Sequence, residues 1–299
     1  MFADIADRTW LWGAAGFYLA GFLLGTWSLL RSGRPAGGLT NILIAAGYAL
    51  QLVGLGLRGK ADQGCPIGNT FEIFQFTAWS AITLYFVIGV TFRLSLLGYF
   101  TSCLSAVLTL VSLAIPIWDA TRRTRVFGGH PLIELHAALA LFSYGVFALL
   151  ALTSLMFLLR HFSLKSKRLG GAFSFLPSIM DLDHIGVRLL VAGVSLLGVS
   201  LMMGLTFWAQ GIAAVDAGKF IAPLVVWVAY GAALGLRLRG QLLAKRFAWT
   251  CLVLFPIALL SLGFVDASRH PINLPVKVGR VFPAALSSHP LHPASLVHP

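Results

Sequence analysis

The sequence predicts an all-α protein, a polytopic transmembrane helix bundle of about eight spans with both chain ends on the outer side of the membrane. Of its 299 residues, 58% are hydrophobic and only 11% are charged, whereas a soluble domain carries about 25% charged residues. The apolar residues occur in long blocks, and about 20 helical residues are enough to cross the hydrocarbon core of a bilayer. Because a helix satisfies its own backbone hydrogen bonds, membrane spans explain these blocks better than one large soluble core does.

Eight apolar blocks are long enough to be interpreted as spans. In chain order they cover residues 10–30, 39–57, 71–92, 96–118, 135–159, 187–207, 220–236 and 247–265. Trp10, Trp12 and Trp27 lie near the ends of the first block, as residues of an interfacial aromatic belt do. The chain is therefore divided into a transmembrane domain, residues 1–270, and a tail rich in proline and serine, residues 271–299, which we expect to be disordered.

The distribution of lysine and arginine favours an outer N-terminus. With that orientation, twelve of these residues lie in inner loops and ten in outer segments, and the two densest basic clusters, at 160–168 and 237–246, are both inside. The segment before residue 10 carries Asp4 and Asp7, lacks the cationic start of a signal peptide, and is expected to be a short external tail. The formal charge of +12 is explained by loops beside anionic lipid, and no nucleic acid partner is expected.

Motifs of soluble enzymes do not occur in the sequence. The three cysteines are isolated, with no CxxC pair that would indicate a thiol relay or a zinc site. There is no Ser–His–Asp pattern, no P-loop and no HExxH motif. The sequence therefore gives no positive support for catalysis by this chain alone.

Ionisable side chains at the ends of spans are the candidate functional residues, because such groups are costly in a membrane. Glu72 opens the third span, with Gln75 one turn further on; its alternative role is that of an acid at a helix N-terminus, with Asn69 as the cap. His136 opens the fifth span and His270 follows the eighth, so both imidazoles are expected at the outer surface. Neutral imidazole is a good axial ligand for haem iron, although either histidine alone is more often a hydrogen-bonded residue of the interface.

Two further groups have simpler structural explanations. Asp183 and Arg188 flank the start of the sixth span, where a helix cap and an inner-surface anchor are expected. The outer connection between the sixth and seventh spans holds Trp208, Asp216 and Lys219, which suit an aromatic belt and loop charges. The stretch FLPSIMDLDH before the sixth span is expected to form a surface helix or a re-entrant segment.

Four segments, taken in their order along the chain, also carry a family resemblance. They read CPIGNTFEIFQFTAW, LHAALALFSYGVFALLALTSLMFLL, LPSIMDLDHIGVRLLVAGVSLLGVSLMMGLTFWA and SRHPI. The residues at the family's characteristic places are Pro66, Asn69, Phe71, Glu72, Trp79, His136, Ser143, Tyr144, Pro177, Leu182, Asp183, Arg188, Gly193, Gly204, Trp208, Ala209 and His270. Over roughly residues 66–271, the chain thus resembles the cytochrome c assembly family of polytopic haem-handling membrane proteins, the CcsA/HemX-like group.

The resemblance implies a protein of the bacterial inner (cytoplasmic) membrane that binds or passes haem transiently at its outer face. It implies that His136 and His270 are the metal ligands and that Glu72 and Tyr144 shape the pocket. The other residues assigned to the cofactor are Trp208 and Asp216, with Arg122, Arg123 or Arg125 available for the haem propionates. The implied partners are the lipid bilayer, haem, and a protein of cytochrome c assembly or haem biosynthesis.

One loop departs from the family pattern. Haem-delivering members carry a tryptophan-rich external loop that ends in Trp-Asp-Pro-Lys-Glu, whereas this chain reads FWAQGIAAVDAGKF at that place. Only Trp208, Asp216 and Lys219 correspond to residues of that loop. The departure favours a HemX-like relative, and an alternative function is therefore a non-catalytic membrane scaffold or regulator of haem biosynthesis.

Overall fold

The computed structural model describes residues 2–32, 37–92, 95–120, 131–166, 177–209 and 217–267. These residues form long α-helices and one short 3₁₀ helix, with no strand among them, which confirms the predicted fold class. The elements are α1 (Phe2–Ser32), α2 (Gly37–Asp62), α3 (Thr70–Phe92), α4 (Ser95–Ala114), η1 (Pro116–Asp119), α5 (Pro131–Ser166), α6 (Ile179–Ala209), α7 (Ala217–Leu238) and α8 (Ala244–Ala267).

Within the residues that the structure describes, seven helices are long and apolar enough to cross a membrane, namely α1, α2, α4, α5, α6, α7 and α8. Helix α3 carries Glu72 and Gln75 in its first two turns. The prediction of about eight spans agrees with these helices, and the chain is a multi-pass membrane protein. Below, the predicted outer end means the starts of α1, α3, α5 and α7 together with the ends of α2, α4, α6 and α8; the predicted inner end is the opposite one.

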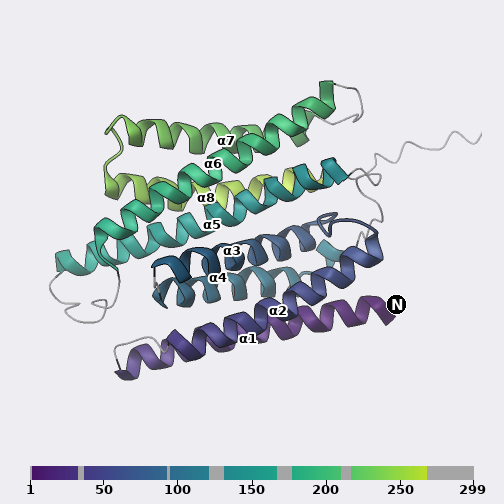
Figure 1. Ribbon diagram of the computed structural model, residues 1–299, viewed down its shortest axis with the longest axis horizontal. Helices are drawn as coiled ribbons and strands as arrows, with labels where there is room; N and C mark the ends of the chain where they lie inside the picture. The colour runs from purple at the N-terminus through teal and green to yellow at the C-terminus, as the bar shows by residue number, and fades with distance from the viewer. Residues whose placement is uncertain are drawn as a thin grey trace, which may run out of the picture. The chain divides into compact units, whose positions relative to one another are not determined.

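Helix α5 is the central element of the bundle. It packs against α6 and α8 on one side and against α3 and α4 on the other, while α1 and α2 pair with each other and with α4 (Figure 1). Two glycines permit its closest contacts: a Cβ on Gly145 would lie 2.5 Å from Ser80 Cβ of α3, and one on Gly193 of α6 would lie 2.4 Å from the Phe147 ring. Small residues at such crossings let helix backbones approach closely, which strengthens packing where water supplies no driving force.

Local capping chemistry sets the helix starts. The side chain of Asn69 accepts a 2.9 Å hydrogen bond from the backbone N–H of Glu72 and thereby caps α3. At the start of α6, Ser178 is the cap: its Oγ accepts a hydrogen bond from the Asp181 N–H at 3.1 Å and donates to the Asp181 carboxylate at 2.6 Å. The Asn69 cap agrees with the alternative role expected for Glu72 at a helix N-terminus.

Three predicted boundaries differ from the structure. The N-terminal segment is helical from Phe2 rather than a tail, and its Asp7 is buried. The span predicted at 96–118 ends as an α-helix at Ala114, because Pro116 disfavours the helical conformation for Ile115, and the chain continues as η1. The stretch expected to form a separate surface helix is, from Ile179 onward, the first turn of α6 itself.

The first prediction concerns the contact between α3 and α5. Replacing Gly145 by alanine puts a methyl group against the Ser80 side chain and the Ala81 backbone, so the two helices must separate. Overpacking of this kind lowers the free energy of unfolding by about 1–3 kcal/mol, which denaturant unfolding in detergent, followed by tryptophan fluorescence, would measure. The matched control is Gly231→Ala in α7, where a Cβ meets no atom within 4 Å; equal stability of the two variants would contradict the close contact.

Candidate functional site

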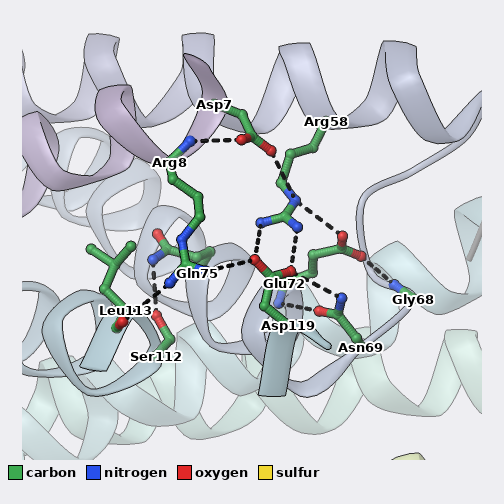
Figure 2. Close-up of polar contacts among 10 residues, drawn as sticks. All are labelled: Asp7, Arg8, Arg58, Gly68, Asn69, Glu72, Gln75, Ser112, Leu113 and Asp119. Atoms are coloured by element: carbon green, nitrogen blue, oxygen red, sulfur yellow. Dashed lines mark hydrogen bonds and ion pairs between the residues drawn. The ribbon is translucent and has the colours of Figure 1, made fainter. Parts of the chain in front are cut away.

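The predicted outer end contains a buried cluster of charged side chains around Arg58 of α2 (Figure 2). The guanidinium is 1% exposed, and its Nε lies 3.4 Å from Asp7 Oδ2 of α1 and 3.2 Å from Glu72 Oε1 of α3. Its two terminal nitrogens donate to the two carboxylate oxygens of Asp119 in η1. One cation is therefore surrounded by carboxylates from three other elements, in a geometry that suits the fork of a guanidinium.

Neighbouring polar groups complete this cluster. The backbone N–H of Gly68 donates to Glu72 Oε2 at 2.6 Å, and the Asn69 amide donates to Asp119 Oδ1 at 3.5 Å. Arg8, which is partly exposed, lies with Nη1 3.3 Å from Asp119 Oδ2. Glu72 thus interacts with Arg58 and with the loop between α2 and α3, so its carboxylate organises this end of the bundle.

A separate network of neutral hydrogen bonds joins helices α1, α2, α3 and α4. The Tyr18 hydroxyl donates to Gln51 Oε1 at 2.8 Å, and the Gln51 amide donates to Gln75 Oε1 at 2.8 Å. The Gln75 amide donates to Ser112 Oγ at 2.9 Å, and that hydroxyl donates to the Thr109 carbonyl at 2.8 Å. The side chains of Tyr18, Gln51, Gln75 and Ser112 are all fully buried. Each linked donor has an acceptor, as an apolar interior requires, so the network specifies how the helices pack.

The loop between α2 and α3 connects the charge cluster to the start of α5. The backbone N–H of Cys65 donates to Glu134 Oε2 of α5 at 3.3 Å, and Gly64 leaves room for the same carboxylate. Burial, followed by the charges of Glu134 and Glu72, raises the pKa of the Cys65 thiol to about 11. Cys65 therefore remains a protonated thiol at neutral pH, and the loop serves as a packed connection between Glu72 and α5.

His136 lies two residues after Glu134 and faces α6. Its Nδ1 is 2.6 Å from the backbone oxygen of Ser200 and 3.0 Å from that residue's Oγ. The Ser200 hydroxyl in turn donates to the His136 carbonyl at 2.8 Å. Nε2 has no hydrogen-bond partner within the part of the chain that the structure describes. The imidazole is thus held through Nδ1.

The remaining predicted site residues are placed only in part. Tyr144 is buried in α5, with its hydroxyl 3.5 Å from Ser261 Oγ of α8 and its ring edge-on to Phe147. Trp208 belongs to the last turn of α6, but its side chain is outside the described residues. The residues that lie wholly outside them are Arg122, Arg123, Arg125, Asp216 and His270. The pairing of His136 with His270 therefore stays a prediction.

A separate ion pair lies at the predicted inner end. Asp183 of α6 accepts a hydrogen bond from Arg237 of α7, whose Nη1 also donates to the Leu242 carbonyl at 2.9 Å. The sequence suggested a capping role for Asp183, but Ser178 caps this helix. Asp183 instead neutralises a cation of another helix and ties α6 to α7.

Sequence reasoning missed Asp7, Arg58 and Asp119. From the sequence, Asp7 is expected in a short external tail, Arg58 in an outer segment, and Asp119 directly after the span predicted at 96–118. The available signal was position: Arg58 directly follows the apolar block at 39–57, so one more turn of the same helix places it beside the polar start of α3. Among the described residues, no group of three histidine, cysteine or acidic side chains could hold a bare metal ion.

Comparison with known proteins adds a family and two relatives. The family model described as cytochrome C assembly protein matches residues 67–270. "Protein HemX" of Brevibacillus brevis is 26% identical over 272 residues, which cover 89% of this chain and 99% of that protein. "Protein HemX" of Bacillus subtilis (strain 168) is 29% identical over 245 residues, which cover 78% of this chain and 87% of that protein.

The second prediction concerns the charge cluster. Replacing Arg58 by alanine leaves Asp7, Glu72 and Asp119 around a buried site without its central cation, and breaking a buried ion pair in this way costs about 3–5 kcal/mol. Detergent-solubilised Arg58→Ala protein should unfold at clearly lower denaturant concentration than the wild type. Adding Glu72→Gln to this variant removes one of the unpaired charges and should restore part of the loss.

The control for that experiment is Arg239→Ala, because Arg239 is exposed at the predicted inner end. Surface substitutions of this kind usually change stability by less than about 0.5 kcal/mol. Wild-type stability of Arg58→Ala, or no recovery in the double variant, would show that Arg58 does not neutralise this cluster.

Proposed function

We propose that this protein, which belongs to the cytochrome C assembly protein family, binds or passes haem at the predicted outer end of its helix bundle. The observation that carries the proposal is the state of His136. A carbonyl oxygen only accepts hydrogen bonds, so Nδ1, which lies 2.6 Å from the Ser200 carbonyl, must carry the proton. A neutral imidazole with the proton on Nδ1 has an unprotonated Nε2. The lone pair of this nitrogen is the one that can ligate a metal.

The position of His136 also suits a large flat ligand. The residue is half-buried near the start of α5, at the predicted outer end of the bundle. Haem brings its own iron, so single histidines would be enough to hold it. In this proposal, His136 and His270 would together hold the iron.

Other side chains have supporting roles in this proposal. Glu72 holds Arg58 and the loop between α2 and α3, which in turn contacts Glu134 near the start of α5. Tyr144, eight residues after His136 on α5, would shape the pocket. The residues that would contact the rest of the porphyrin are Trp208 at the end of α6, Asp216 before α7, and one or more of Arg122, Arg123 and Arg125 before α5. We place the protein in the bacterial inner (cytoplasmic) membrane with this site on its outer face.

The third prediction tests the ligands. Protein purified in detergent and supplied with haem should show a Soret band and, on reduction, the sharp bands of a six-coordinate haem. His136→Ala with His270→Ala should abolish this spectrum, because both axial nitrogens are lost, and each single variant should shift it. The matched control is His161→Ala, since that histidine lies near the end of α5 at the predicted inner side. A double variant with the wild-type spectrum would exclude these ligands.

A second function is favoured by the predicted inner end. There Arg239, Lys245 and Arg246 are exposed, close in sequence to the turn between α7 and α8. The last turn of α5 adds Lys165, and the connection after it adds Lys167 and Arg168. Both relatives bear the name HemX. In this alternative, the protein is a non-catalytic scaffold or regulator that binds an enzyme of haem biosynthesis through these cations.

The fourth prediction separates the two functions. If the scaffold function holds, an enzyme of haem biosynthesis from the same cell should co-purify with the wild type. This co-purification should be lost when Lys165, Lys167 and Arg168 are changed to glutamine, because the protein then no longer attracts an acidic surface of the partner at this place. The haem spectrum of this triple variant should be unchanged. Co-purification that survives the triple change would contradict the assigned surface, and loss of haem together with the partner would contradict the separation of the two ends.

A further inference from the structure

His136 and Ser200 form a reciprocal clamp between α5 and α6. The Ser200 hydroxyl has one proton, which it donates to the His136 carbonyl at 2.8 Å. Its oxygen is therefore free to accept from His136 Nδ1 at 3.0 Å, and the Ser200 carbonyl accepts from the same nitrogen at 2.6 Å. All three contacts are consistent with only one tautomer, the one protonated at Nδ1.

Gly204 lies one turn beyond Ser200 on the same face of α6, since residues four apart are neighbours on a helix. A Cβ at this position would lie 2.8 Å from Cε1, 3.2 Å from Nε2 and 3.4 Å from Nδ1 of His136. The ring therefore lies against the bare backbone of α6. Because its Nδ1 is already held by Ser200, the ring cannot turn aside to make room for a methyl group without breaking the clamp.

We propose that Ser200 and Gly204 of α6 form a seat that fixes the tautomer and the ring plane of His136, and that this seat orients the nitrogen that ligates haem. This inference rests on the proposed haem function. Neither residue touches the iron; both are positioning residues that act through His136. A hydrogen bond from Nδ1–H to a carbonyl also increases the basicity of Nε2, and losing such supporting contacts typically weakens metal binding by about 10- to 100-fold.

The seat can be tested without haem. Protein labelled with ¹⁵N-histidine is examined in detergent by NMR, and the His136 signals are assigned by their loss in His136→Gln. The wild type should show a protonated Nδ1 and an unprotonated Nε2. Gly204→Ala should replace this pattern by the other tautomer or by an average of both, because the displaced ring loses the Ser200 carbonyl. A wild-type imidazole protonated at Nε2, or an unchanged pattern in Gly204→Ala, would overturn the proposal.

The same variants test the effect on haem. Gly204→Ala should bind haem about tenfold more weakly, with a shifted Soret maximum and midpoint potential, and Ser200→Ala should show a smaller change in the same direction, since it keeps the backbone carbonyl. Added imidazole should restore a six-coordinate spectrum in Gly204→Ala by replacing the misplaced ligand. The matched control, Gly231→Ala, changes the same residue types in α7, where a Cβ meets nothing within 4 Å, and should leave haem binding unchanged.

The two kinds of failure are distinguishable. Wild-type protein that binds no haem contradicts the proposed function, and the NMR result then still decides whether the seat sets the tautomer. Wild-type haem binding that depends on His136 but is the same in Gly204→Ala overturns the seat and leaves the proposed function standing. A loss of haem in Gly204→Ala that added imidazole does not reverse also overturns the proposal, because it indicates general misfolding rather than a misplaced ligand.

Discussion

The buried guanidinium of Arg58 is the constraint on which the predicted outer end depends. A charge removed from water is tolerated only when opposite charges and hydrogen bonds replace its hydration, and a membrane interior offers no water to correct a poor arrangement. Here the compensation comes from Asp7, Glu72 and Asp119, which belong to three different elements. The start of α1, the end of α2, the start of α3 and η1 must therefore meet at one point for any of these charges to be accommodated.

This convergence extends to the candidate ligand through a short series of contacts. Glu72 accepts the backbone N–H of Gly68, and the same loop donates from Cys65 to Glu134, two residues before His136. On its opposite side, α5 meets α6 at the His136–Ser200 contact. The first part of α5 is thus held from both sides, by the backbone hydrogen bond from Cys65 in the loop between α2 and α3 and by the contact of His136 with Ser200 on α6. An imidazole held this way keeps its orientation.

The sequence predicts the helices well because each one is encoded by its own apolar block, and it predicts the Asn69 cap because the interacting groups are three residues apart. It does not predict the pairing of Arg58 with Asp119, since these residues are separated by 61 positions and the pairing exists only once four elements have packed. His136 could be singled out as a costly polar residue in an apolar span. Ser200 could not, because a serine within a transmembrane helix is common and nothing local marks it as the partner of a histidine 64 positions away.

The position of Arg58 also bears on how much of the chain forms the functional unit. The family match begins at residue 67, so it includes Glu72 and Asp119 but not the cation between them. Without α1 and α2, these two carboxylates would share a buried site with no central charge to neutralise them. The loop in which the Cys65 N–H donates to Glu134 would also lose its attachment to α2. Helices α1 and α2 are therefore part of the same structural unit as the matched segment, because the charges at the start of α3 require the arginine that α2 supplies.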